Sequence, residues 1–206
     1  MASVLRSPWL AAALAIAAVS GCSASSTPAS RSGEAASGQS RLTTTYGQSG
    51  KLEKLVYDRN SDGKADTWGY MDGTRIVRVE IDENGDGRVD RWEFHKANGA
   101  DAGDAPQGGA SDPTLERVER ATKLDGKISR WEYFSNGVLA RIEEDTDGDG
   151  KLDKWESYKD GSLVTLSLDT QGRGTPDRRL VYAPDGSLVR LEADVNGTGT
   201  FTPLNP

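Results

Sequence analysis

The chain is poor in the residues that usually hold a protein core together. Its 206 residues include one Cys, one His, two Met and three Phe, and only 35% of them are hydrophobic. A single cysteine excludes disulfides within the chain, and so few large apolar side chains argue against a thick conventional core. The 24 Gly residues instead favour an architecture with many turns.

Positive charge is also in short supply. The sequence has 25 Lys and Arg against 32 Asp and Glu, which gives a formal net charge of −7. Nucleic acid would repel such a chain, so we expect no nucleic-acid partner, whereas metal cations are favoured as ligands. The sequence shows no Ser-His-acid set and no phosphate-cradling loop, and the single His95 is expected to be solvated at a strand end. We therefore do not expect an enzyme.

Residues 1–21 predict an export signal. Arg6 precedes an eleven-residue apolar run, Trp9 to Val19, which is shorter than the roughly 20 residues of a transmembrane helix. The run ends in Val19-Ser20-Gly21-Cys22, which resembles the lipobox of bacterial lipoproteins. This resemblance implies cleavage before Cys22, acylation of its thiol and anchoring in a lipid bilayer of the cell envelope, in the outer membrane if the source has two membranes.

The rest of the chain divides into a tether and a repeat domain. Residues 22–41 are rich in Ser and Ala without apolar periodicity, and they predict a flexible tether. Within residues 42–206, Gly-containing segments recur with spacings of 24, 39, 24 and 24 residues, at Asp62, Asp86, Asp125, Asp149 and Arg173. The polar residues 100–114 account for the longer spacing and are predicted to be a disordered insertion. The domain is therefore a series of 24-residue repeats.

Each repeat predicts one β-hairpin. An acidic loop is followed by an aromatic segment, an Asx-Gly turn and an aliphatic segment such as Val77, Val79 and Ile81, in which apolar and polar residues alternate. The predicted turns are Asp72-Gly73, Asn98-Gly99, Asn136-Gly137, Asp160-Gly161 and Asp185-Gly186. Asx-Gly between alternating runs strongly favours a hairpin. We predict a mainly β fold of about five antiparallel hairpins that bury their faces against neighbours.

Three acidic loops carry the chemistry. Residues 82–93 and 145–156 match the D-x-[DN]-x-[DN]-G-x₅-E pattern of the EF-hand calcium loop, while the loop from Asp58 matches except for Gly69 at position 12. Calcium takes six to eight oxygen ligands, which such loops supply. The predicted ligands, with position 7 contributing its carbonyl, are Asp58, Asn60, Asp62, Lys64 and Asp66; Asp82, Asn84, Asp86, Arg88, Asp90 and Glu93; Asp145, Asp147, Asp149, Lys151, Asp153 and Glu156.

Turn chemistry alone is the competing interpretation, because Asp and Asn favour tight turns. However, two carboxylates at about 4 Å repel by roughly 4 kcal/mol at an effective dielectric of 20, and loop 82–93 gathers several of them. We therefore predict Ca²⁺ as the cofactor. Residues 121–132 have Ala121 and Lys123 at positions 1 and 3, so we expect no calcium there. The copies that begin at Asp169 and Asp194 should bind weakly or not at all.

The resemblance to EF-hands ends at the edges of the loops. Helical EF-hand or dockerin-like pairs are the alternative fold, but only residues 70–81 separate the first two loops, and they contain a predicted turn. The chain is more similar to bacterial hairpin arrays with EF-hand-like connectors, in the style of MORN-type and cell-wall-binding repeats. On a strand, positions 11 and 12 point to opposite faces. Both the Asp at position 9 and the Glu at position 12 therefore remain candidates for the closing ligand.

A tryptophan stripe leaves two functions open. One repeat position is shared by Trp68, Trp92, Trp131 and Trp155. These side chains predict either the core of the array or an exposed ladder for glycan strands. The sequence thus predicts a calcium-binding, lipid-anchored structural or interaction module of the cell envelope, with a carbohydrate or peptidoglycan binder as the alternative. A calcium sensor is disfavoured, because the spacers are too short for a switching helix pair. The partner, an envelope protein or a glycan, is left open.

Overall fold

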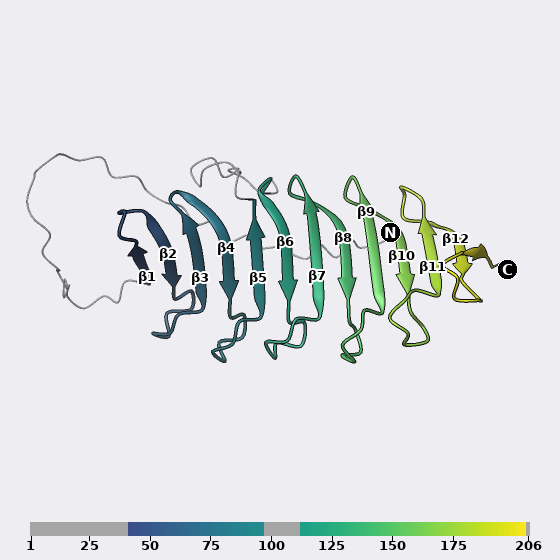
Figure 1. The fold of residues 1–206 in the computed structure, drawn as a ribbon, viewed down its shortest axis with the longest axis horizontal. Helices are drawn as coiled ribbons and strands as arrows, with labels where there is room; N and C mark the ends of the chain where they lie inside the picture. The colour runs from purple at the N-terminus through teal and green to yellow at the C-terminus, as the bar shows by residue number, and fades with distance from the viewer. Residues whose placement is uncertain (1–40, 97–111, 205–206) are drawn as a thin grey trace, which may run out of the picture.

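The computed structural model describes residues 41–96 and 112–204, which form one antiparallel sheet (Figure 1). The predicted mainly β fold is confirmed. Its strands pair in sequence order and are β1 (Leu42–Tyr46), β2 (Leu52–Tyr57), β3 (Thr67–Asp72), β4 (Arg75–Ile81), β5 (Arg91–His95), β6 (Leu115–Arg120), β7 (Arg130–Ser135), β8 (Val138–Glu144), β9 (Lys154–Lys159), β10 (Ser162–Leu168), β11 (Arg178–Tyr182), β12 (Leu188–Ala193) and β13 (Thr202–Pro203). No helix in the described part is suited to crossing a membrane.

Several predictions fall on residues outside the described ranges. The predicted signal peptide, Cys22 and the tether up to residue 40 lie there, as does the turn Asn98-Gly99. Of the predicted insertion, residues 100–114, only Asp112 to Thr114 are described.

The hairpin turns join the strands at one of their ends and form one long edge of the sheet, and the acidic loops join them at the other end and form the opposite edge (Figure 1). Asn136-Gly137 has φ values of 50° and 73°, and Asp160-Gly161 has φ values of 51° and 80°, as a type I′ turn requires. The β1–β2 hairpin was not singled out from the sequence, because its turn has no Asx-Gly pair. Because hairpin turns and acidic loops alternate along the chain, every described acidic loop lies on the same edge.

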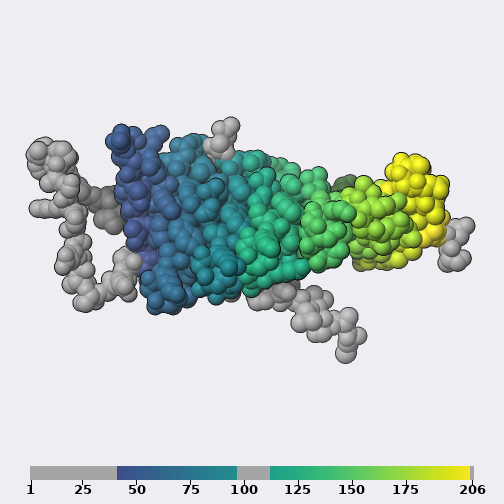
Figure 2. Space-filling view, turned by 60° about the horizontal axis from the view of Figure 1, so that its bottom comes forward, coloured from purple at the N-terminus to yellow at the C-terminus, as the bar shows by residue number. Residues whose placement is uncertain are grey.

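The sheet is a single layer (Figures 1 and 2). Its strands lie side by side, and Figure 2 shows an elongated body that narrows toward the C-terminal end. Most strand residues are consequently half-buried on both faces. The buried hydrophobic side chains among the described residues are Leu55, Met71, Val118, Ala121, Ile142 and Ala193.

One face, here called the tryptophan face, carries the four tryptophans on alternate strands with glutamates between them. The cross-strand register gives the row Trp68, Glu80, Trp92, Glu119, Trp131, Glu143 and Trp155. Because neighbouring strands are about 4.8 Å apart, successive tryptophans stand roughly 9.6 Å apart along the row. Each tryptophan is half-buried. The stripe is therefore neither a continuous stack of indoles nor a fully exposed ladder.

The glutamates of this row are held by aromatic and basic neighbours. Tyr70 Oη donates to Glu80 Oε2 at 2.8 Å, Arg78 pairs with Glu80 at 3.1 Å, and the Arg78 guanidinium lies 4.2 Å from the Tyr70 ring centroid. The same arrangement recurs where Tyr133 Oη donates to Glu143 at 3.2 Å. Cation–π and ion-pair contacts thus cover much of this face in place of a second layer.

The opposite face, here called the ion-pair face, carries a continuous charged network from β5 to β9. Arg120 bridges Glu83 at 3.4 Å and Glu132 at 3.2 Å. Arg130 pairs with Glu132 at 2.8 Å and also with Glu144. The network continues from Glu144 to Lys154, which in turn pairs with Glu156. The register sets Arg91, Arg120 and Arg130 directly opposite one another, which would destabilise the sheet without the intervening acids.

Candidate functional site

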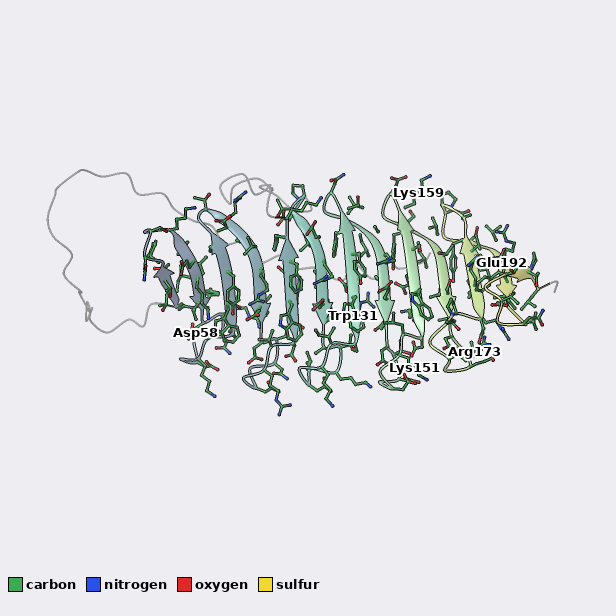
Figure 3. The ribbon with its side chains drawn as sticks, in the orientation of Figure 1. Asp58, Trp131, Lys151, Lys159, Arg173 and Glu192 are labelled. Carbon is green, nitrogen blue, oxygen red and sulfur yellow. The ribbon has the colours of Figure 1, made fainter. Side chains whose placement is uncertain are left out.

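The candidate site is the row of acidic loops along one edge of the sheet. Figure 3 shows Asp58, Lys151 and Arg173 along this edge and Lys159 at the opposite, hairpin edge. In every described loop after the first, the first residue donates its N–H to the position-9 carbonyl of the preceding loop. These bonds are Asp82 to Asp66 at 2.8 Å, Ala121 to Asp90 at 2.7 Å, Asp145 to Ser129 at 2.8 Å, Asp169 to Asp153 at 2.8 Å and Asp194 to Asp177 at 3.0 Å. The loops are therefore held in a fixed row.

The position-1 carboxylate organises each acidic loop from within. Asp82, which is 2% exposed, accepts the N–H groups of Gly85 and Gly87 at 2.7 Å each. Both glycines have left-handed φ values, 78° and 91°, which a side chain at these positions would disfavour. Asp58 and Asp145 cap their loops in the same way.

Positions 3 and 5 bring further oxygens to the rim of each loop. Asp145, Asp147 and Asp149 each offer a carboxylate oxygen, and these atoms lie within 4.8 Å of one another. Asp147 accepts the Asp149 N–H at 3.0 Å, and Asp149 accepts the Lys151 N–H at 2.8 Å, through one oxygen each. This cluster of three aspartates could hold a metal ion. The pairs Asn60 with Asp62 and Asn84 with Asp86 make the same backbone bonds in their loops.

The predicted position-7 residues contribute exposed side chains at the rim. Lys64, Arg88 and Lys151 each donate a backbone N–H to the position-5 aspartate of their own loop. The Lys151 ammonium also donates to the Gly172 carbonyl of the next loop at 3.0 Å. The backbone contacts tie each loop to itself, and the Lys151 side chain also ties loop 145–153 to the next loop.

The position-9 carboxylate points back into its own loop. Asp66 accepts the Arg59 N–H at 2.9 Å, Asp90 accepts the Glu83 N–H at 3.3 Å, and Asp153 accepts the Thr146 N–H at 2.9 Å. In each case the donor is the second residue of the loop. Asp66 and Asp90 are buried, being 4% and 1% exposed. The two ends of each loop are therefore joined through this carboxylate.

The position-12 glutamates lie on the ion-pair face. Glu93 pairs with Arg91, while Glu156 pairs with Lys154 at 2.9 Å and accepts the Tyr158 hydroxyl at 2.7 Å. Burial acts to raise the pKa of Glu156, but the hydrogen bonds from Lys154 and Tyr158 outweigh it and the pKa is lowered. The structure thus ties position 9, rather than position 12, to the start of its own loop, while the carboxylate cluster of loop 145–153 comprises positions 1, 3 and 5.

The remaining loops follow the same backbone turns but carry other side chains at some of the ligand positions. In loop 121–129 the buried Ala121 stands at position 1, and the Lys123 ammonium reaches the Asp147 carbonyl of the next loop at 3.3 Å. Asp169 accepts N–H bonds from Gln171 and Gly174. Burial opposes the effect of these donors, but together the backbone N–H groups lower the pKa of Asp169. Asp194 is held similarly by Thr198 and Gly199.

The prediction that His95 is solvated is wrong. Its side chain is only 7% exposed, and its Nδ1 lies 3.1 Å from Asp112 Oδ2 and 3.1 Å from Thr114 Oγ1. Both partners belong to the last residues of the predicted insertion, just before β6. Their position beside β5 could therefore not be predicted from local sequence. The ion-pair network was also missed. Its signal in the sequence is the Arg-x-Glu spacing that recurs on the strands.

Comparison with known proteins gives no assignment: no protein-family model matches the chain, and no curated protein matches it significantly.

Proposed function

We propose that the chain is a calcium-binding, calcium-stabilised β-hairpin array that serves as a structural or interaction module of the cell envelope. The observation that carries the proposal is the aspartate cluster of loop 145–153, whose three carboxylate oxygens lie within 4.8 Å of one another. Calcium suits this donor set because it is a hard cation that takes six to eight oxygens. Loops 58–66 and 82–90 repeat the same donor positions.

Position 9 is the proposed closing ligand of each site. Its carboxylate accepts the N–H of the second residue of the loop, whereas the position-12 glutamates are engaged by basic side chains on the ion-pair face. Calcium would offset the repulsion among the loop carboxylates. Since consecutive loops are joined by backbone hydrogen bonds, an ion in one loop supports the strands on both sides of it.

Calorimetric titration of the full chain with CaCl₂ tests this proposal. We expect about three ions per chain, with dissociation constants in the range of roughly 10⁻⁴–10⁻³ M that is typical of extracellular modules. Asp149→Asn should remove one ion, whereas Asp125→Asn, in the loop that has Ala121 and Lys123, should leave the number unchanged. A chain that releases no heat with calcium and shows no calcium-dependent change in melting would rule the function out.

Anchoring through an acylated Cys22 is a separate part of the proposal, and it rests on the lipobox resemblance. The lipid bilayer is then the first partner of the chain. Metabolic labelling with a fatty acid should mark the wild type and not Cys22→Ser, and fractionation should release the variant from membranes. Equal labelling of both proteins would refute the anchor without touching the calcium sites.

A glycan-binding role is the second candidate. The half-exposed tryptophans that alternate with glutamates on one face favour it, because part of each indole remains accessible on one side of the sheet. Soluble peptidoglycan fragments should then quench tryptophan fluorescence, and Trp131→Ala should reduce this quenching. If quenching is absent and Trp131→Ala mainly lowers stability, the tryptophans serve the sheet alone.

A further inference from the structure

The two ends of the sheet are built differently (Figure 1). At the C-terminal end, β13 has two residues, and one of them is Pro203, which has no N–H to donate. At the other end, β1 has five residues, all of them exposed and none of them charged. Natural sheets guard an edge strand with a short length, a proline or a charge. The strand β13 has the first two of these guards, whereas β1 has none and is open to a further strand.

The backbone of β1 presents hydrogen-bonding groups to this open edge. Asp58 donates its N–H to the Arg41 carbonyl at 2.8 Å. Gly47 donates its N–H to the Lys51 carbonyl, also at 2.8 Å. Positions 41 and 47 thus face the β2 arm of the hairpin, and the backbone groups of successive residues point alternately to the two sides of a strand. The N–H and C=O groups of Thr44 therefore point away from β2, toward the open edge.

The side chains of β1 match those of a second β1 strand that runs antiparallel to the first. With Thr44 of the two copies opposite each other, Leu42 of each copy stands opposite Tyr46 of the other. These side chains are 39% and 61% exposed, and within the described residues 41–96 they are the only exposed large hydrophobic ones. The pairing would cover each of them with the other. It would also set threonines opposite threonines, a favourable cross-strand pair.

Charges extend the match just beyond the ends of this pairing. In the same register, Arg41 of one copy stands opposite Gly47 of the other. The exposed Glu53 places its carboxylate against Gly47, where it would meet any larger side chain. The Arg41 guanidinium donates to the Asp58 carbonyl at 3.0 Å, and neither Arg41 nor Glu53 has an ion-pair partner among the described residues. The pairing would therefore bring opposite charges together at both of its ends.

We propose that β1 is a docking edge for a second copy of this chain, and that two copies join their β1 strands antiparallel about a twofold axis at Thr44. The two sheets then continue one another through backbone hydrogen bonds across the axis. Because the same surface is used by both copies, the association closes with two chains and does not lead to a filament. The inference goes beyond the proposed function, since it does not depend on calcium in the loops.

Sedimentation of the full chain at a series of concentrations in CaCl₂ tests the docking edge. We expect a mass that rises with concentration to about twice that of one chain. Thr44→Lys sets two like charges opposite each other and should weaken the association about tenfold. Thr202→Lys, the same change on the opposite edge strand β13, is the matched control and should leave it unchanged. A monomer at every concentration, or an association that Thr44→Lys does not weaken, overturns the proposal and leaves the calcium titration unaffected.

Charge exchange between copies tests the register. Arg41→Glu alone opposes acid to acid, and Glu53→Arg alone opposes base to base, so each variant should associate about fivefold more weakly than the wild type at low salt. An equimolar mixture of the two variants restores an opposite-charge pair at both ends and should recover the wild-type association. A mixture that associates no better than the separate variants would refute the antiparallel register. Circular dichroism verifies that each variant keeps its strands.

Discussion

Loops 82–90 and 121–129 have the same backbone and opposite chemistry. In each, the position-9 N–H donates back to the end of the preceding strand at 2.9 Å, Asp90 to Ile81 and Ser129 to Arg120. Each also turns through a left-handed position 4, at Gly85 with φ of 78° and at Leu124 with φ of 52°. The first loop gathers acidic residues, whereas the second replaces the position-1 acid by an alanine.

The difference shows that the turn does not require its acids. In loop 121–129 the Thr122 and Ser129 hydroxyls lie 2.6 Å apart and join positions 2 and 9 without a carboxylate, and Asp125 at position 5 still accepts the Lys127 N–H at 2.9 Å. Its backbone keeps this shape although Leu124 adopts a conformation that costs a non-glycine residue roughly 1–2 kcal/mol. Loop 82–90 thus holds more carboxylates than this backbone needs, which favours a role for the excess in holding a cation.

The largest expected effect is the loss of calcium from all three acidic loops. At 100 times Kd, each site adds roughly 2.7 kcal/mol, so three sites together add roughly 8 kcal/mol. A chelator should therefore lower the melting temperature strongly in calorimetric scans. Asp86→Ala and Asp149→Ala should reduce the effect of the chelator, while Asp125→Ala should not. Identical melting with and without chelator would remove the distinction between the two kinds of loop.

Removal of a position-1 acid should have the next largest effect, even without calcium. Asp82→Ala leaves the Gly85 and Gly87 N–H groups without their acceptor, which we expect to cost about 2–4 kcal/mol in chelator. Thr122→Ala removes one hydroxyl contact from loop 121–129 and should cost about 1 kcal/mol. Urea denaturation measures both. A smaller loss for Asp82→Ala than for Thr122→Ala would contradict the role assigned to position 1.

The repeat period and the Asx-Gly turns were sufficient to predict hairpins in sequence order, because both signals are local. The EF-hand pattern also singles out Asp58, Asp82 and Asp145 at position 1, where the structure shows each of them accepting backbone N–H groups of its loop. The hydrogen bond from the Thr146 hydroxyl to Asp153 was not predicted, because it depends on a side chain that the pattern leaves free. The single layer could not be predicted either. It depends on arginine–glutamate pairing between strands, such as Arg120 with Glu132 and Arg130 with Glu144, that replaces a second sheet.

A smaller effect is expected from acid, which should weaken the loops capped by Asp169 and Asp194 and spare loop 121–129. Because backbone N–H groups overcome burial and hold the pKa of Asp169 below the ordinary 3.8, its contribution is present above about pH 3.8 and is lost as the pH falls through the folded-state pKa. Urea midpoints in chelator should therefore fall as the pH is lowered below about 4. Asp169→Asn should flatten part of this dependence, since the amide oxygen still accepts but does not titrate. An unchanged slope in this variant would show that other carboxylates control acid stability.

The smallest expected effect concerns the contact between loop 121–129 and loop 145–153. Lys123 of loop 121–129 places its ammonium 3.3 Å from the Asp147 carbonyl, beside the aspartates of loop 145–153. Because the side chain is exposed, Lys123→Gln should change stability in chelator by less than about 1 kcal/mol. Loss of a positive charge beside a cation site should nevertheless tighten calcium binding at loop 145–153 by a few fold at low salt, and by less at high salt. Lys127→Gln, on the same loop, is the matched control and should leave the affinity unchanged. If both variants shift the affinity equally, the effect reports overall charge, and the contact between loops 121–129 and 145–153 has no part in it.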